Sequence, residues 1–144
     1  MAVRDDYEDG KAYNNAVAEE FRANEGKVGG DWEGRRIMIL TTTGAKSGQP
    51  HETPLGFSWD GDRMVLSAAN GGAPKHPDWY LNLLASPEVT VELGTEKYQA
   101  TAVDSEGEEY DRLVVARSES NPAFVRNQSR TTRRIPLVWL DRIG

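Results

Sequence analysis

Short runs of apolar and β-branched residues, each bounded by glycine, proline or aspartate, recur along most of this 144-residue chain. Runs of this length and composition are typical of β-strands. Asp60-Gly61 and Gly94 are turn signals that join neighbouring runs into two hairpins. The runs predict about six strands, at Arg36–Thr43, Thr53–Trp59, Arg63–Ala69, Val89–Leu93, Lys97–Val103 and Ile135–Leu140.

The first segment of the chain has a helical pattern instead. Tyr13, Val17 and Phe21 recur at a spacing of four residues within Tyr7–Asn24, and Asp9 is a candidate cap for this helix. Glycines follow the segment and would end the helix. The same stretch also reads as a mobile arm.

Two or three shorter helices are expected between the later strands. Pro77 suits a first helical turn, and Ser86-Pro87 would end that helix. The residues Ser105-Glu106-Gly107-Glu108 match a capping box, which predicts a helix after them. A further short helix is expected near Pro122–Asn127.

The order of these elements favours an α+β, mainly β fold. Hairpins make neighbouring strands antiparallel, and the strand–helix–strand alternation of a doubly wound parallel sheet is not present in the pattern. A small antiparallel barrel with surrounding helices is the favoured fold, because closing the sheet would remove its exposed edges. The length suits one domain. We divide it into an N-terminal helix or arm (residues 1–30) and a barrel (residues 31–144).

Composition excludes several kinds of chemistry. The chain has no cysteine, so disulfides, thiolate nucleophiles and cysteine-ligated metals are ruled out, and a reducing cytoplasm is the expected location. The two histidines, His51 and His76, follow no metal-ligand spacing, so we expect no metal site. A net charge of −6 argues against a nucleic-acid partner. No apolar run is long enough for a membrane span, and the charged N-terminus lacks the apolar core of a secretory signal.

The most informative segment is Thr41–Leu55, TTTGAKSGQPHETPL, which contains a polar loop between two predicted strands. Glycines let backbone N–H groups converge, Lys46 adds a positive charge and Ser47 adds a hydroxyl, so the loop is a plausible anion cradle. It is not a Walker A loop, because Ala45 precedes the lysine and a strand follows. The alternative interpretation is an ordinary hairpin loop with a solvated lysine.

Two further segments carry candidate chemistry. In Ser67–Leu83, small residues at a strand end would let a flat ring approach the backbone, and Trp79 would form an aromatic wall or simply core. The segment Arg126–Arg134, RNQSRTTRR, concentrates arginines in an acidic protein. These arginines would help hold an anionic ligand or, as we favour for most of them, form a solvated face.

Taken together and in this order, four motifs resemble the deazaflavin-dependent nitroreductase family. The motifs are TTTGAKSGQPHETPL, GG-x-P-x-HP-x-WYLNL, SPEVTVELG and RRIPLVWL, and they extend over roughly Ile37 to Leu140. The resemblance implies a split β-barrel oxidoreductase that uses coenzyme F420. In such proteins the reduced deazaflavin delivers a hydride from C5 to a quinone, an enone or a nitro compound, and the protein supplies position and electrostatics.

The resemblance also implies a set of cofactor-binding residues. Those that would hold the phosphate and the glutamate tail are Lys46, Ser47, Gln49 and His51. Those that would flank the ring or offer it backbone groups are Pro54, Leu55, Ser67, Ala68, Ala69 and Asn70. The pocket wall would consist of Trp79, Tyr80 and Asn82, and the N-terminal helix would cover the acceptor site.

The chain departs from the family pattern at several of these positions. Ala45 and His51 stand where the family commonly has arginines, which weakens the expected grip on the tail. Ala69, Phe124 and Asn127 stand where hydroxyl-bearing residues line the acceptor site of a nitroreductase. These departures disfavour nitroreduction of the same substrates, and Tyr13 is then the remaining candidate hydroxyl donor, although its helical position also suits the core.

Two alternatives to an F420-dependent reductase follow from the same residues. The first keeps the fold but binds FMN, which has a phosphate and no glutamate tail. The second is a non-catalytic protein that binds the deazaflavin, as the missing hydroxyl groups suggest. Split barrels often pair as homodimers, but the sequence itself holds no sign of a partner surface.

Overall fold

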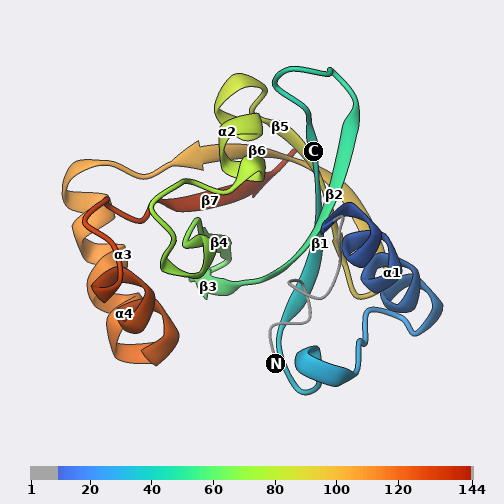
Figure 1. Cartoon of the computed structure of the whole chain (residues 1–144), viewed down its shortest axis with the longest axis horizontal. Helices are drawn as coiled ribbons and strands as arrows, with labels where there is room; N and C mark the ends of the chain where they lie inside the picture. The colour runs from blue at the N-terminus through green and yellow to red at the C-terminus, as the bar shows by residue number, and fades with distance from the viewer. Residues whose placement is uncertain (1–9, 144) are drawn as a thin grey trace.

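The computed structural model describes residues 10–143 and consists of one curled antiparallel sheet with helices around it (Figure 1). The strands are β1 Ile37–Thr43, β2 Pro50–Gly56, β3 Ser58–Asp60, β4 Arg63–Ser67, β5 Glu88–Leu93, β6 Glu96–Asp104 and β7 Leu137–Arg142. The α-helices are α1 Gly10–Ala23, α2 Asp78–Ala85, α3 Gly107–Ser120 and α4 Pro122–Ser129. Two single-turn 3₁₀ helices, η2 Gly30–Trp32 and η3 Asn70–Gly72, complete the described chain.

The seven strands lie in the order β2-β1-β5-β6-β7-β4-β3, and every pair is antiparallel. The sheet curls into a half-barrel, as the family resemblance implies, but it does not close. Within residues 10–143, β2 and β3 are edge strands that do not pair with each other. The expectation of a closed barrel without edges was therefore wrong. Prolines at Pro50 and Pro54 suit an edge strand, where a missing N–H breaks no ladder.

The strand count rises from about six to seven because one predicted run is divided. Thr53–Trp59 contains the end of β2 and most of β3, with Phe57 between them. The predicted hairpin at Asp60 is confirmed, although its two turn residues are Gly61 and Asp62, because Asp60 pairs with Arg63. Gly61 has a φ of 63°, which suits the first position of a type II′ turn.

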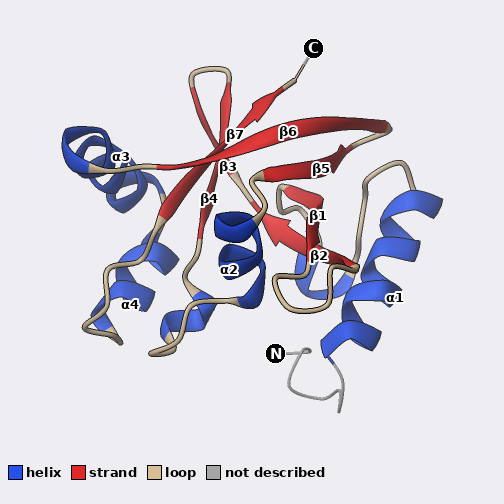
Figure 2. Ribbon diagram, turned by 90° about the horizontal axis from the view of Figure 1, so that it is seen from above, coloured by secondary structure: helices blue, strands red, loops and turns tan. Residues whose placement is uncertain are grey.

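The inner face of the half-barrel holds the main core, which we call the barrel core. In β1, Met38 and Leu40 point inward, and Ile37 and Ile39 point outward. Helix α2 lies across the interior and adds Trp79, Tyr80 and Leu83 to this core (Figure 2). Both faces of β1 are thus covered, which explains why its sequence is a continuous apolar run.

Helices cover the outer face of the sheet in two separate places (Figure 1). The α1 cluster joins Tyr13, Val17 and Phe21 to the outward residues of β1. The α3–α4 cluster lies beside β4 and β7 and consists of Val65, Tyr110, Leu113, Phe124, Ile135, Leu137 and Trp139. The helical spacing predicted for the first segment is therefore confirmed, while its candidate cap Asp9 lies outside the described residues.

The predicted capping box at α3 is wrong. Glu106 is the N-cap residue and makes no side-chain capping bond. The buried Ser105 hydroxyl instead donates to the Leu137 carbonyl oxygen at 2.6 Å, across the sheet. The short helix expected near Pro122–Asn127 does form as α4, and the Asn121 side chain caps it by accepting from Ala123 N at 3.0 Å.

An ion-paired arginine ties α1 to the sheet. Arg22 donates to both oxygens of Glu92, at 2.8 and 2.6 Å, and also pairs with Glu52 on the edge strand β2. Glu92 is only 8% exposed, and the hydrogen bonds from Arg22 lower the pKa of its carboxyl group. A carboxylate buried to this degree depends on its cation.

In residues 10–143, no helix is long and apolar enough to cross a bilayer.

We expect Arg22→Met to lower the free energy of unfolding by about 1–3 kcal/mol, because it leaves the buried Glu92 carboxylate without a cation. The loss should shrink as the pH falls through the range in which Glu92 takes up a proton, since a neutral carboxyl needs no cation. The control is Glu96→Gln, which breaks an exposed pair with Arg142 and should cost at most about 1 kcal/mol. Urea unfolding measures both, and equal losses in the two variants would contradict the role of Arg22.

Candidate functional site

The loop between β1 and β2 folds back on itself. Gly44 N donates to the Gln49 carbonyl oxygen at 2.8 Å, and Gly48 N donates to the Gly44 carbonyl oxygen at 2.9 Å. A Cβ at position 44 would lie 2.4 Å from the Ser47 hydroxyl and 2.7 Å from Nε2 of His51, so any other residue there would displace these two side chains. The glycine therefore lets the polar side chains of the loop approach the backbone.

The loop of residues 44–49 carries one positively charged side chain, Lys46, and we call it the Lys46 loop. The Ser47 hydroxyl accepts from Gln49 N at 3.1 Å and lies 3.3 Å from Nε2 of His51. The Lys46 side chain is exposed, and its ammonium group makes no hydrogen bond or ion pair with any residue from 10 to 143. A lysine without a carboxylate partner, beside a hydroxyl and an imidazole, suits an anionic ligand.

Asn82 fastens the Lys46 loop to helix α2. Its carbonyl oxygen accepts from Ala45 N at 3.0 Å, and its amide nitrogen donates to the Thr42 hydroxyl at 3.2 Å. The two bonds fix the orientation of the amide group and hold the start of the loop against the helix. The structure thus brings together two sets of predicted residues that are far apart in the sequence. Thr42, which is 2% exposed, belongs to this contact and was not predicted.

The segment after β4 is the second part of the site. Ala68 is completely buried in the barrel core, whereas Ala69 lies against the α3–α4 cluster and Asn70 is exposed. Ser67 faces the outer side of the sheet, where its hydroxyl accepts from Nε and Nη2 of Arg117 at 3.2 and 3.1 Å. The side chains of this segment therefore point in different directions and do not form one surface. The feature that these residues share is a continuous stretch of backbone.

Arg133 holds the backbone of this segment and was missed by sequence reasoning. Its guanidinium donates to the carbonyl oxygens of Ala68, Ala69 and Ala73 at 3.2, 2.7 and 2.9 Å. It also donates to Nδ1 of His76 at 3.1 Å. Arg133 is therefore an exception to the solvated face expected for most arginines of Arg126–Arg134, because carbonyl groups distant in the sequence surround it.

Tyr80 connects α2 to the far side of the barrel. Its hydroxyl donates to Asp104 at 2.7 Å, and burial together with this carboxylate raises the pKa of Tyr80. The other carboxylate oxygen of Asp104 is buried and has no hydrogen-bond partner within residues 10–143. The His76 ring packs against the Tyr80 ring with the ring centroids 4.9 Å apart. Arg133, His76, Tyr80 and Asp104 therefore lie in one cluster, joined by hydrogen bonds at its two ends and by this ring contact between them.

The remaining predicted residues are not all brought to one surface. Trp79 is 6% exposed and belongs to the barrel core. Pro54 pairs with Ile39 on the outer side of the sheet, while Leu55 packs against the barrel core on the inner side. Tyr13 is buried in the α1 cluster, where its hydroxyl accepts from Nε1 of Trp32 at 2.9 Å. Its role as a proton donor to an acceptor stays a prediction.

Helix α1 packs on the outer face of β1 and β2, on the side away from Met38 and α2. Residues 1–9 precede the described part of the chain. The expectation that the first thirty residues cover the acceptor site therefore stays a prediction.

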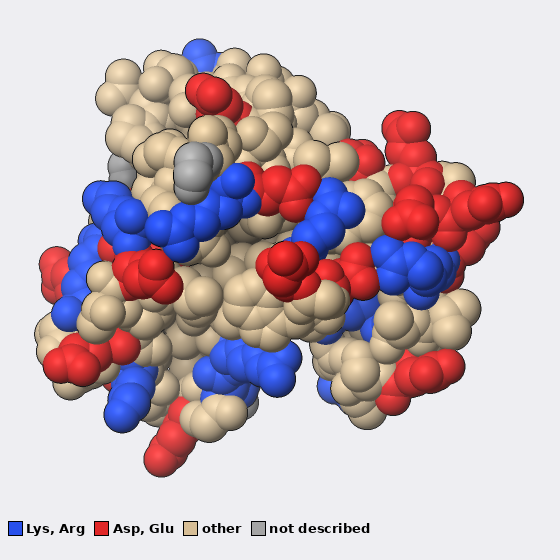
Figure 3. Space-filling view, turned by 180° about the vertical axis from the view of Figure 1, so that it is seen from behind, with Lys and Arg blue, Asp and Glu red and all other residues tan. Residues whose placement is uncertain are grey.

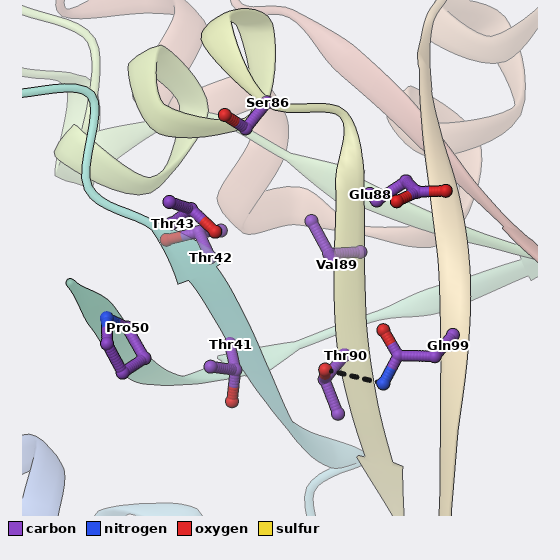
Figure 4. A pocket seen from close by; sticks show the side chains of 9 residues that line it. All are labelled: Thr41, Thr42, Thr43, Pro50, Ser86, Glu88, Val89, Thr90 and Gln99. Carbon is purple, nitrogen blue, oxygen red and sulfur yellow. Dashed lines mark hydrogen bonds between the residues drawn. The ribbon is translucent and has the colours of Figure 1, made fainter. Parts of the chain in front are cut away.

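A polar hollow of about 470 Å³ begins at the base of the Lys46 loop (Figure 4). Its lining consists of Thr41, Thr42, Thr43, Pro50, Ser86, Glu88, Val89, Thr90 and Gln99. The Gln99 amide donates to the Thr90 hydroxyl at 2.9 Å within it. No lysine or arginine lines this hollow, and Glu88 does, so it is a poor match for an anionic cofactor.

Many acidic side chains gather on the side of the protein where α3 lies. Figure 3 shows acidic side chains crowded on the side where α3 lies, and mixed charges over the rest of that face. Helix α3 begins with Glu108 and Glu109 in its first turn. A net charge of −6 therefore does not prevent the Lys46 loop from presenting a positive charge locally.

The comparisons with known proteins identify the class of protein as a split-barrel oxidoreductase. A sequence model of the F420H2-dependent quinone reductases matches residues 14–141. The chain belongs to this family.

Several relatives support the assignment. An F420H2-dependent quinone reductase of Mycobacterium tuberculosis is 38% identical over 126 residues, which are 85% of each chain. A solved F420H2-dependent reductase is 37% identical with a TM-score of 0.66, over 74% of this chain and 95% of that chain. Another structure, described as a domain-swapped dimer, is 33% identical with a TM-score of 0.68, over 90% of this chain and 96% of that chain. The haem storage protein HutZ of Vibrio cholerae, at 16% identity and a TM-score of 0.56, shares the fold alone.

The residues present fit the cofactor that this family uses. Coenzyme F420 carries a phosphate and carboxylates, and the Lys46 loop offers an unpaired ammonium group next to the Ser47 hydroxyl and His51. A charged donor set of this kind matches an anionic tail better than an uncharged ligand.

We expect His76 to make the stability of the protein sensitive to mild acid. Burial, and then the Arg133 cation, lower the pKa of His76 below its ordinary value of 6.5. The unfolded chain therefore takes up the proton first, and the free energy of unfolding falls as the pH drops below about 6.5. His76→Asn keeps a neutral acceptor for Arg133 and should reduce the change in urea midpoint between about pH 7.5 and about pH 5.5. An unchanged pH dependence in the variant would refute this role.

Proposed function

We propose that this protein transfers a hydride from reduced F420 to a quinone, with the cofactor tail bound at the Lys46 loop and its ring beside α2. The observation that carries the proposal is the Asn82 amide, which joins the loop to α2 through Ala45 and Thr42. Membership of the F420H2-dependent quinone reductase family supports both the cofactor and the class of reaction.

The Lys46 loop would bind the negatively charged end of the cofactor. Lys46 supplies a positive charge, and Ser47 and His51 supply polar groups that lie 3.3 Å apart. Gln49 donates its backbone N–H to Ser47, so it holds the hydroxyl in place. The exposed position of the loop leaves room for a tail of variable length to extend into solvent.

The ring would lie between the segment after β4 and helix α2. Ala68, Ala69 and Asn70 would contribute backbone groups to the ring, and Leu55 would contribute apolar surface. Asn82 would orient the part of the ring that lies nearest the Lys46 loop. Trp79 and Tyr80 are buried, so they would support this wall from behind. When bound, reduced F420 supplies the hydride, while the chain binds the cofactor, orients it and excludes water.

A quinone is a better match for the acceptor than a nitro compound. Ala69 and Phe124 carry no hydroxyl group, and Phe124 is 3% exposed within the α3–α4 cluster. The chain therefore offers no hydroxyl donors at the positions where the nitroreductase resemblance places them. After the hydride has been transferred, a quinone needs one proton to become the hydroquinone, and water can supply it.

We also propose that the protein pairs with a second copy of itself. Both β2 and β3 are edge strands, and Trp59 on β3 is 44% exposed. An unpaired edge with an exposed aromatic residue favours association. The structure described as a domain-swapped dimer, at 33% identity, supports this state. Light scattering of the purified protein measures the mass directly, and a monomer at micromolar concentrations would contradict it.

Side-by-side fluorescence titrations with F420 and with FMN test the proposed function. We expect saturable binding of F420 and much weaker binding of FMN, because FMN lacks the carboxylate tail. The F420-loaded protein should then reduce a soluble quinone in proportion to the F420H2 consumed. Tight binding of F420 without reduction of any quinone would favour the non-catalytic alternative, and preferred binding of FMN would contradict the proposal.

We expect Lys46→Met to weaken F420 binding by about 1.5–3 kcal/mol, because it removes a charge-assisted contact. The difference from the wild type should shrink at high salt, since the site is exposed. Lys27→Met is the matched control, because Lys27 is an exposed lysine after α1, away from the Lys46 loop. Titration at low and high salt measures all three proteins, and an unchanged dissociation constant for Lys46→Met at low salt would rule out the anion-binding role.

A further inference from the structure

Arg133 differs from the arginines of this protein that pair with carboxylates. Arg22, Arg63 and Arg112 each pair with a carboxylate. Arg133 makes no ion pair with any residue between 10 and 143, and its four hydrogen bonds go to three carbonyl oxygens and one imidazole nitrogen. The guanidinium group is planar, and its N–H donors point in fixed directions. An arginine that donates to several backbone carbonyl groups therefore fixes the orientation of those peptide groups.

The carbonyl groups that Arg133 holds determine where the neighbouring N–H groups point. Every peptide bond in the described chain is trans. In a planar trans peptide unit, the carbonyl and the N–H of the next residue point in opposite directions. Since the carbonyls of Ala68 and Ala69 point at Arg133, the N–H groups of Ala69 and Asn70 point away from it. Neither N–H donates to another residue in the described part of the chain.

The backbone conformation brings these two donors close together. Ala69 is right-handed, with φ −81° and ψ −34°, and Asn70 is left-handed, with φ 48°. Successive residues of opposite hand form a concave set of N–H groups that receives an anion or an electron-rich oxygen. A left-handed non-glycine residue must be held in place by its surroundings. Asn70 is held by its own amide, which donates to the Lys75 carbonyl oxygen at 3.0 Å, and by Arg133 behind it.

We propose that Arg133 is a positioning residue that aims the N–H groups of Ala69 and Asn70 at an electron-rich oxygen of the bound deazaflavin ring. This inference rests on the proposed function. Reduction adds a hydride, which is two electrons and one proton, at C5 of the ring. The ring thereby gains one negative charge, which its oxygens share. Donors fixed in this direction bind the reduced cofactor more tightly than the oxidised one, because hydrogen bonds to charged acceptors are stronger. Arg133 thereby raises the midpoint potential of bound F420 without touching the cofactor.

The test compares the full-length wild type with Arg133→Lys, which keeps the charge and removes the fork that spans several carbonyls. Two quantities are measured: the dissociation constant of oxidised F420, and the midpoint potential of the bound cofactor by redox titration. We expect Arg133→Lys to weaken binding of reduced F420 roughly tenfold more than binding of the oxidised form. A tenfold difference lowers the midpoint potential by about 30 mV for a two-electron couple.

Arg126→Met is the control. Arg126 is an exposed arginine of α4 whose side chain bonds to no residue within 10–143, and its loss should leave both quantities unchanged. The inference fails if Arg133→Lys has the wild-type potential, even if both redox states bind more weakly, because a merely loosened fold would act on both equally. A wild type that does not bind F420 refutes the proposed function instead, so the two failures can be told apart.

A measurement on the wild type covers the case in which Arg133→Lys does not fold. Addition of F420 to ¹⁵N-labelled protein should shift the amide resonances of Ala69 and Asn70 downfield, as new hydrogen bonds form. The amide of Ala68 already donates to the Pro136 carbonyl oxygen at 2.9 Å and should move much less. Unchanged Ala69 and Asn70 resonances at saturating F420 would overturn the inference.

Discussion

The fastening of helix α2 inside an unclosed sheet is the constraint on which the site depends. Two polar side chains of this one helix reach in opposite directions. Asn82 bonds to the backbone of the Lys46 loop, and Tyr80 bonds to Asp104 on β6. Trp79 and Leu83 fill the barrel core between these contacts. Because the sheet stays open between β2 and β3, a helix can occupy its interior and still place residues at the surface.

The arginines of this acidic protein serve two different purposes. Those on the periphery, such as Arg22 and Arg112, hold helices to the sheet through carboxylates. Arg117 and Arg133, near the segment after β4, bond only to neutral groups in the described chain, and burial lowers the pKa of both. Because neither guanidinium is paired with a carboxylate, both positive charges remain available to favour an anionic cofactor over a neutral one.

Much of the fold was predictable from local patterns, and the errors have physical causes. The strands, the helix α2 and the family followed from alternation, turn residues and four ordered motifs. The capping box failed because the Ser105 hydroxyl bonds to Leu137, which is distant in the sequence. β2 and β3 are separate strands on either side of Phe57 because β2 pairs with β1 and β3 pairs with β4, at opposite edges of the sheet, and this pairing is tertiary. The Lys46 loop was identified as an anion cradle from its composition, and its attachment to Asn82 was not, since that is a tertiary contact. Arg133 was missed for the same reason, because its partners lie across the fold.

The central claim is that the Lys46 loop and the segment after β4 belong to one F420 site on the two sides of α2. A crystal structure of the protein with F420 bound tests this most directly. The account predicts the phosphate and tail at Lys46 and Ser47, and the ring beside Ala69 and Asn82. Cofactor in the threonine-lined hollow between β1, β5 and β6, or on the α1 face, would contradict it.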